Sequence, residues 1–388
     1  MLFSRAPDFK GIVRNAVVLT FGFSIWRVLF NNYAKEVFDI SAAEIGIIQA
    51  VREIPGLLGF TVGIMALALA EVHIATLSIA LTGVGLIMCG FADSVFMLGV
   101  GTVVMSLGFH QMFTANGALL LHFIKGPESG RLQGVMDSWQ AVAAVGATLI
   151  IFATTLLLGY KAIFIGSGAA LVILGVVFTF MFKSNRGVAE NRTFKLKRHY
   201  SLYYAIHFLR GCRRHIFTTF AIFLMVANHG LEIQYTALLL LATSAITIYT
   251  SRLFGNLTEK IGEKVVLASS SFLLIFIFSG YAFITMMPLL IGLFVLDHVL
   301  FGSSVALQSY IRKIALPSDL TTCLSFGQTA NHITAVIIPV VGGIMWDTLG
   351  YKTTFMLGAV IVLADCLLSL LVNPHKQRLV DPTASSNW

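Results

Sequence analysis

The chain is a series of long apolar segments joined by short polar connections. An α-helix needs about 20 mostly apolar residues to cross a bilayer, and twelve segments of the chain reach that length. We therefore predict a membrane-spanning helix over each of them. The predicted spans are 13–34, 44–66, 72–91, 95–121, 134–158, 162–182, 203–227, 233–253, 265–285, 288–311, 322–345 and 353–372.

The long polar segment KSNRGVAENRTFKLKRHY (183–200) separates six predicted helices from six others. Two halves with equal numbers of helices indicate an internal repeat, a layout typical of secondary transporters. The predicted organisation is a six-helix bundle over 1–182, a linker over 183–200, a second six-helix bundle over 201–373 and a polar tail over 374–388.

The composition agrees with an all-α membrane protein. Hydrophobic residues make up 57% of the chain and charged residues only 11%, whereas soluble domains carry about 25% charged residues. The four cysteines lie in or beside apolar segments without a CxxC spacing, which indicates small buried side chains. No Walker loop, G-x-S-x-G or HExxH motif is present, so we expect neither an enzyme nor a bound cofactor.

The placement of lysine and arginine predicts the orientation. With the N-terminus in the cytoplasm, 18 of the 26 basic residues lie on the cytoplasmic side and only Lys35, Lys161 and Lys352 lie outside. This asymmetry follows the positive-inside rule, and it explains the net charge of +8 without a nucleic-acid partner. We expect the first apolar segment to be a retained helix, both termini to be cytoplasmic, and the membrane to be a bacterial inner membrane. The remaining five basic residues lie inside predicted spans: Arg27, Arg52, Arg210, Arg213 and Arg214.

The first helix of each half carries an arginine at a matching place. The stretches IWRVLFNNYA (25–34) and CRRHIFTTFA (212–221) align with identities at Arg27/Arg214, Phe30/Phe217 and Ala34/Ala221. Three identities in ten residues are weak evidence alone. The helix count predicts the same pairing independently, so we interpret the two arginines as equivalent positions of a repeat.

The connection between the eighth and ninth predicted helices reads GNLTEKIGEK (255–264). It resembles the cytoplasmic loop motif of the major facilitator superfamily, G-x-L-x-(D/E)-(R/K)-x-G-x-(R/K). Its glycines permit a tight turn and a close helix approach, and its acidic residue can pair with a neighbouring helix. The corresponding loop of the first half, GIMALALAEVH (63–73), keeps only Gly63. We expect a gating role for Gly255, Glu259, Lys260, Gly262 and Lys264.

The resemblance implies 12 transmembrane helices in two pseudo-symmetric six-helix bundles around a central cavity. Helices 1, 4, 7 and 10 of the superfamily line that cavity, and the bundles rock to expose it to either side in turn. A monomer in a lipid bilayer is the superfamily's usual state, and we expect it here.

Each of these four helices carries ionisable groups, which are costly inside a membrane and therefore mark functional sites. Structural alternatives stay open: Arg210 or Arg213 can reach the membrane surface, and Arg27 or Arg214 can pair with Glu53 or Asp297. Arg52 and Glu53 are adjacent, so we expect each to pair with a different helix. The predicted substrate-binding residues are Arg27, Asn31, His110, Gln111, Arg210 and Arg214. The predicted proton-coupling residues are Glu53, Asp297 and His298.

Arginine is suited to carboxylate and phosphate because its planar fork makes bidentate hydrogen bonds. Two arginines facing one another across a cavity repel, and an anion between them would stabilise both. The placement of Arg27, Arg214 and His110 resembles that in the organophosphate antiporters of the superfamily. We therefore predict a secondary transporter of a small organic or phosphorylated anion, driven by protons or by exchange for a counter-anion.

Three alternatives remain. A divalent-metal transporter would use Asp297, His298, His110 and His332, although nearby arginines would repel a cation. A multidrug exporter is compatible with the many aromatic residues. A membrane sensor or scaffold that does not transport is the third, and substrate flux into vesicles would exclude it.

Overall fold

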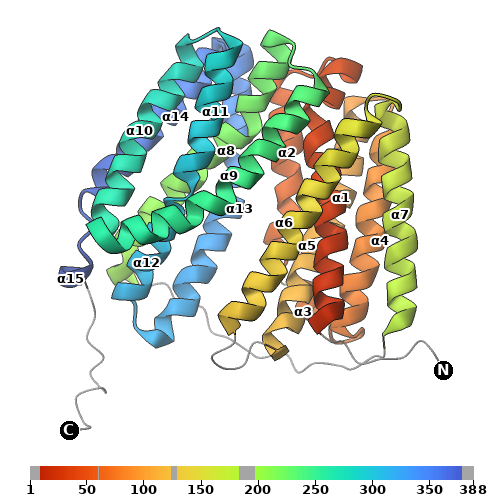
Figure 1. Cartoon of the computed structure of the whole chain (residues 1–388), viewed down its shortest axis with the longest axis horizontal. Helices are drawn as coiled ribbons and strands as arrows, with labels where there is room; N and C mark the ends of the chain where they lie inside the picture. The colour runs from red at the N-terminus through yellow and green to blue at the C-terminus, as the bar shows by residue number, and fades with distance from the viewer. Residues whose placement is uncertain (1–8, 60, 124–128, 183–196, 378–388) are drawn as a thin grey trace. The chain divides into compact units, whose positions relative to one another are not determined.

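A computed structural model describes residues 9–59, 61–123, 129–182 and 197–377, and every element in these ranges is a helix (Figure 1). The chain divides into two compact units. Unit 1 comprises Met1–Asn191 with Gly230–Leu241, and unit 2 comprises Arg192–His229 with Ala242–Trp388.

Unit 1 contains the helices of the first half of the chain and the beginning of one helix of the second half. The first-half helices are α1 (Phe9–Phe38), α2 (Ala42–Leu57), α3 (Thr61–Met65), α4 (Glu71–Phe91), α5 (Val95–Phe123), α6 (Ser129–Thr154) and α7 (Tyr160–Met181). The shared helix is α9 (Ile233–Ile261), whose first residues belong to unit 1.

Unit 2 contains the rest of α9 and the other helices of the second half. They are the 3-10 turn η1 (Arg198–Tyr200), α8 (Ser201–His229), α10 (Glu263–Phe283), α11 (Met287–Phe301), α12 (Ser304–Ile314), α13 (Pro317–Leu349), α14 (Tyr351–Ser369) and the short α15 (Pro374–Gln377).

All twelve predicted segments are helical, and two of them are broken. The segment predicted as 44–66 divides into α2 and α3, because Pro55 lacks an N–H group and Gly56 and Gly59 are weak helix formers. The segment predicted as 288–311 divides into α11 and α12 at Gly302. A Cβ atom at Gly302 would lie 3.0 Å from the carbonyl oxygen of Thr250, so α9 and this break pack backbone against backbone.

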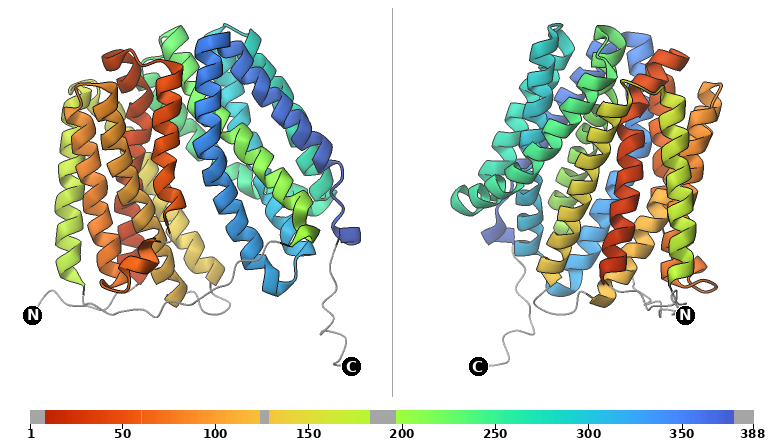
Figure 2. Two further views of the ribbon diagram at one scale, coloured as in Figure 1. Left: turned by 180° about the vertical axis from the view of Figure 1, so that it is seen from behind. Right: turned by 45° about the vertical axis from the view of Figure 1, so that its right-hand side comes forward.

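Helix α4 lies between α5 and α7 in unit 1 and packs against both (Figure 2). Glycines allow this close approach, because in a membrane small residues let helix backbones touch. A Cβ atom at Gly85 would lie 2.1 Å from the backbone nitrogen of Met105, and one at Gly168 would lie 2.6 Å from the carbonyl oxygen of Gly83. Any larger side chain at either position requires the helices to separate.

The same helix pairs pack in both units. Helix α1 packs on α6 in unit 1, as α8 packs on α13 in unit 2. Likewise α4 packs on α5 and α7, as α10 packs on α11 and α14. In each half these are the first helix with the fifth, and the third with the fourth and sixth. The repeat therefore places α1 and α8, and with them Arg27 and Arg214, at equivalent positions of their units.

Nine helices of the described residues are long and apolar enough to cross a membrane, or ten if the bent α9 is one span. Helix α8 is not among them although it is 29 residues long. Its apolar sequence is interrupted by Arg210, Arg213 and Arg214. Helix α8 therefore carries three arginines near its middle, and it also forms one wall of the pocket described below.

The predicted domain boundaries fall largely on residues outside the described ranges. The predicted linker is described only from Lys197, and the predicted tail only as α15. Residues 230–241, which we assigned to the second bundle, belong to the compact unit 1. The boundaries 1–182, 183–200, 201–373 and 374–388 remain predictions.

The residues after the linker are attached to the start of α13. The Lys197 ammonium lies 2.7 Å from Oδ1 of Asp319, and the Tyr200 hydroxyl donates to Oδ2 of Asp319 at 2.8 Å. Burial raises the pKa of Tyr200 to about 12, so the phenol keeps its proton and remains a donor. Burial alone would raise the pKa of Asp319, but the hydrogen bonds from Lys197 and Tyr200 outweigh it and hold that pKa below its ordinary value of 3.8.

Replacing Asp319 with asparagine should lower the thermal midpoint of the purified protein at neutral pH. A carboxylate whose pKa is lowered by folding stabilises the fold above its ordinary pKa, and this contribution disappears as pH falls through the lowered value. The difference between wild type and Asp319→Asn should therefore shrink below about pH 4. A difference that is constant from pH 7 to pH 3 would show that the charge of Asp319 is irrelevant.

Candidate functional site

Unit 2 contains a pocket of about 110 Å³ between α8, the α11–α12 break and α13. Three guanidinium groups lie on its wall, and none of the described residues that line it carries a carboxylate. The residues that line it include Tyr203, His207, Arg210, Arg213, Arg214 and Phe301.

Most of the pocket's polar wall is one face of α8. Tyr203, His207, Arg210 and Arg214 are spaced three or four residues apart, and side chains with this spacing share a helix face. The apolar residues between them, such as Ile206 and Phe217, are buried in the core of unit 2. The sequence of α8 thus fixes both its packing face and its polar face.

Arg210 is held by groups of unit 2. Its Nε lies 3.3 Å from Oδ2 of Asp365, which is 1% exposed. Its terminal nitrogens donate to the hydroxyl groups of Ser303, Ser270 and Ser271 at 3.3–3.4 Å. This network joins α8 to α10 and α14. The geometry favours a structural role for Arg210 over the substrate-binding role that we expected.

Arg213 and Asp297 form a second buried ion pair, between α8 and α11. Nη1 of Arg213 donates to Oδ1 of Asp297 at 2.6 Å, and both side chains are 6% exposed. Neither side chain of this pair reaches the membrane surface. Asp297, a predicted proton-coupling residue, is therefore the partner of Arg213, for which the membrane surface was one of the alternatives.

Arg214 occupies the remaining position on the polar face. Its side chain is exposed, and its guanidinium carbon lies 5.1 Å from the ring centre of Phe301 across the pocket. Arg210 and Arg213 are thus paired with acidic residues that do not line the pocket. Arg214 packs on an aromatic ring that does. Such a wall offers guanidinium donors and a flat apolar surface to a ligand.

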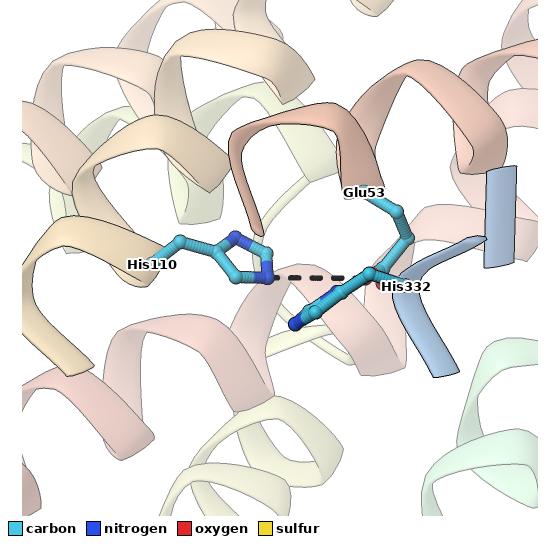
Figure 3. A group of neighbouring side chains, drawn as sticks. All are labelled: Glu53, His110 and His332. Atoms are coloured by element: carbon cyan, nitrogen blue, oxygen red, sulfur yellow. Dashed lines mark ion pairs between the residues drawn. The ribbon is translucent and has the colours of Figure 1, made fainter. Parts of the chain in front are cut away.

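Unit 1 holds a cluster of charged residues between α2 and α5. Glu53 is 7% exposed and forms ion pairs with its neighbour Arg52 and with His110, whose Nε2 lies 3.8 Å from Oε2 of Glu53 (Figure 3). The expectation that Arg52 and Glu53 pair with different helices is thus correct for Glu53 and wrong for Arg52. The Arg52 guanidinium also lies 5.3 Å from the ring centre of Trp26.

The second ring nitrogen of His110 is fixed by its own helix. Nδ1 lies 3.0 Å from both the hydroxyl and the carbonyl oxygen of Ser106. If Nδ1 carries a proton and donates it to the carbonyl, the state of Nε2 depends on the charge of the ring. A protonated Nε2 faces the Glu53 carboxylate with a donor, and a neutral ring faces it with a lone pair. Glu53 and His110 can therefore share one proton.

The other predicted residues of unit 1 lie on α1 and α5. Arg27 is exposed and, among the described residues, has no hydrogen bond or ion pair. Asn31 is 6% exposed, and its carbonyl oxygen has no hydrogen-bond partner in the described part of the chain. Gln111 donates to the hydroxyl of Thr61 at the start of α3, while its own oxygen has no partner within the same ranges. These three side chains thus retain unused hydrogen-bonding groups.

The loop motif adopts the expected turn. Gly262 has a φ of 84°, which requires glycine between α9 and α10. A Cβ atom at Gly255 would meet nothing within 4 Å, so no close helix approach within the described residues explains that glycine. Glu259, Lys260 and Lys264 are exposed. Their proposed gating role is addressed below.

The acid that pairs with a neighbouring helix is Glu263, which we did not predict. It is 3% exposed, forms an ion pair with Lys313 of α12 and accepts a hydrogen bond from the Ser309 hydroxyl at 2.7 Å. Two signals in the sequence could have revealed it. An acid in the first turn of a helix is favoured by the helix dipole, and Ser309 and Lys313 are four residues apart on one face of α12.

His298 and Asp297 point to different partners. Nδ1 of His298 lies 2.9 Å from the carbonyl oxygen of Phe294 in its own helix, and the imidazole packs 4.5 Å from the Phe294 ring. Asp297 faces Arg213 instead. Adjacent helical residues do not converge on one ligand here, so unit 2 does not bring these two together as metal ligands.

The family model described as Major Facilitator Superfamily matches residues 202–387 of this chain. Among curated proteins, the chain is 26% identical to the human MFS-type transporter SLC18B1 over 151 residues, which cover 36% of this chain and 32% of that protein. The mouse protein of the same name is 27% identical over 94 residues. The matched stretches therefore span about a third or less of the length of these curated relatives.

Solved structures show the same fold over almost the whole chain. A bacterial homologue of the human lysosomal transporter Spinster, crystallised in an inward-facing, occupied conformation, superposes with a TM-score of 0.78 at 14% identity over 96% of this chain and 98% of that one. The nucleoside transporter NupG superposes with a TM-score of 0.75 at 14% identity over 94% of this chain and 98% of that one. A bacterial homologue of the iron transporter ferroportin gives 0.74 at 12% identity over 94% and 98%. The second half of this multi-pass membrane protein therefore matches the Major Facilitator Superfamily in sequence, and nearly the whole chain shares the fold of these solved transporters.

Proposed function

We propose that this protein is a transporter of the Major Facilitator Superfamily and that it carries a small organic or phosphorylated anion by alternating access. The observation that supports this proposal is the pocket of unit 2, which has three guanidinium groups and no carboxylate among its described lining residues. Placing these charges in a membrane protein is costly. Carboxylate and phosphate groups are the ligands that guanidinium binds best, because two parallel hydrogen bonds match its fork.

The substrate-binding residues that we retain are those with unused hydrogen-bonding groups or an exposed charge. In unit 2 this is Arg214, which lies on the pocket wall. In unit 1 it is Arg27, the equivalent residue of the repeat, together with Asn31 and Gln111. Arg210 and Arg213 would act indirectly, by fixing the helix that carries Arg214.

Glu53 and His110 are the groups that we propose for proton coupling. They are buried together, and imidazole changes its charge near neutral pH. Arg52 forms an ion pair with the same carboxylate, so a proton that moves between Glu53 and His110 changes the charge balance of all three groups. If the protein instead exchanges one anion for another, the pair would be structural.

Replacing Glu53 with glutamine should uncouple transport from a pH gradient. The amide cannot take up a proton, so uptake of the anion into proteoliposomes should lose its stimulation by an imposed pH gradient while exchange of internal for external anion persists. Glu232→Gln removes a carboxylate from an exposed position of unit 1 and is the matched control. If Glu53→Gln keeps the full stimulation, Glu53 does not carry the coupling proton.

We also propose that both termini are cytoplasmic, that the protein resides in a bacterial inner membrane, and that the loop around Gly262 takes part in gating. The excess of lysine and arginine on one side supports this orientation. In that orientation the Glu263–Lys313 pair and the motif residues Glu259, Lys260 and Lys264 lie on the cytoplasmic side.

A ligand screen on the purified protein tests the substrate class. Carboxylates, phosphate esters and divalent metal ions would each be added while the thermal midpoint is recorded. A ligand present at 100 times its Kd stabilises the folded protein by about 2.7 kcal/mol, so a true substrate should raise the midpoint in a saturable manner. Stabilisation by anions is the expected result. Stabilisation by divalent metals alone would contradict the anion proposal and favour a metal transporter.

A further inference from the structure

His207 lies on the pocket wall and was absent from the residues that we predicted. It shares the polar face of α8 with Arg210 and Arg214, and its ring centre lies 5.6 Å from that of Tyr203 one turn earlier. The pocket therefore contains an imidazole ring one helical turn from its guanidinium groups.

The ring is held against α13 by a glycine. A Cβ atom at Gly327 would lie 2.8 Å from Cε1 and 2.9 Å from Nε2 of His207, distances that packed atoms do not tolerate. The two helices also approach closely at Gly211, where a Cβ atom would lie 2.6 Å from the hydroxyl oxygen of Thr334. The imidazole thus occupies the space that the side chain of any other residue at position 327 would fill.

The chemistry of the ring differs from that of the arginines around it. Guanidinium groups only donate hydrogen bonds, whereas a neutral imidazole has one donor and one acceptor nitrogen. Nδ1 of His207 is buried and has no hydrogen-bond partner among the residues that the structure describes. The terminal torsion of histidine is broad, so a small rotation of the ring can present a nitrogen to a ligand. A ligand hydroxyl group that reaches the ring can donate a hydrogen bond to the unprotonated nitrogen.

Ser304, Gln308 and Asn331 also line the pocket and carry acceptor oxygens. That of Asn331 already lies 3.2 Å from Nε2 of His215. An anion that carries a hydroxyl group can use both kinds of group, because its charged end accepts from arginine and its hydroxyl donates to the histidine. An anion without a hydroxyl leaves the histidine nitrogen unpaired, which carries a free-energy cost.

We propose that His207, held against Gly327, accepts a hydrogen bond from the transported anion and makes the site select hydroxylated anions. The substrate class is then a small carboxylate or phosphate ester with a hydroxyl group beside its charge. This inference rests on the anion-binding function proposed above. It adds a specificity-determining residue to that site.

The test measures binding of two matched pairs of probes to the full chain in lipid nanodiscs by calorimetry. Lactate is compared with propionate, and glycerol 3-phosphate with n-propyl phosphate, so that each pair differs in its hydroxyl groups. The variants are His207→Leu, which removes the acceptor, His207→Gln, which returns a carbonyl acceptor, and Gly327→Ala, which displaces the ring. Gly292→Ala is the matched control, because a Cβ atom there meets nothing within 4 Å.

Wild type should bind the hydroxylated member of at least one pair about tenfold or more tightly than its partner, since a site that hydrogen-bonds a hydroxyl rejects the analogue that lacks it. His207→Leu and Gly327→Ala should lose this preference, His207→Gln should regain part of it, and Gly292→Ala should keep it. If His207→Leu does not fold, Gly327→Ala still decides the result, because its single added methyl group acts through the ring.

Two results would overturn the inference. If the two members bind equally well in both pairs and Arg214→Gln abolishes this binding, the anion function holds and the role of His207 is wrong. The same conclusion follows if the preference persists in His207→Leu and Gly327→Ala. If none of the four probes binds wild type at millimolar concentration, the proposed anion function fails together with the inference.

Discussion

Replacing Asp365 with asparagine should destabilise unit 2 by about 3 kcal/mol. Asparagine has the shape of aspartate and can still accept a hydrogen bond from Ser271, so the packing of α14 on α10 is preserved. The charge is lost, and Arg210 is left without the carboxylate 3.3 Å from its Nε. Removing one partner of a buried ion pair is costly because the remaining charge is not solvated. Resistance of the purified protein to thermal unfolding measures the effect.

Two further variants show whether the charge is responsible. Glu259→Gln makes the same chemical change at an exposed site of unit 2 and should leave the stability unchanged. A double variant, Arg210→Met with Asp365→Leu, should recover most of the loss, since apolar replacements of a buried ion pair are often neutral. An Asp365→Asn protein as stable as wild type would show that Arg210 is solvated in the pocket and does not depend on this acid.

Replacing Arg214 with glutamine should reduce transport by about 30-fold or more. Removing one partner of a hydrogen-bonded charge pair at a binding site costs at least about 2 kcal/mol, and 1.4 kcal/mol corresponds to a factor of ten. Glutamine retains one donor group and much of the length of the side chain but cannot form the bidentate contact. Arg312→Gln, at an exposed position of α12, removes the same charge from unit 2 and should transport as wild type does.

The helices could be predicted from the sequence because apolar length is a local property. Twelve runs of apolar residues gave twelve helical segments, and the two that are broken contain proline or glycine at the break. A break at Gly302 depends on the close approach of Thr250, which lies 52 positions earlier on another helix. Sequence indicates that a glycine is present, but it does not indicate which helix requires it.

The partners of the arginines could not be predicted for the same reason. Arg210, Arg213 and Arg214 are nearly adjacent, and their hydropathy is identical. Asp365 and Asp297, which pair with two of them, lie on α14 and α11. Only the packing of these helices around α8 determines which arginine meets which acid and which one lies beside Phe301.

Two important residues were missed because their surroundings come from distant parts of the chain. His207 has a role only because Gly327 leaves space for its ring. Glu263 falls at a variable position of the loop motif, and its partner Lys313 lies on α12. The motif residues Glu259 and Lys260, by contrast, are exposed, so a motif match located the turn but not the buried ion pair beside it.

The most direct test of the anion proposal is uptake of labelled glycerol 3-phosphate and lactate into proteoliposomes that contain the purified protein. Wild type and Arg312→Gln should show saturable uptake that unlabelled substrate inside the vesicles accelerates, and Arg214→Gln should lose it. Uptake by Arg214→Gln equal to that of wild type would contradict the account. So would a wild-type protein that carries divalent metal ions but no anion.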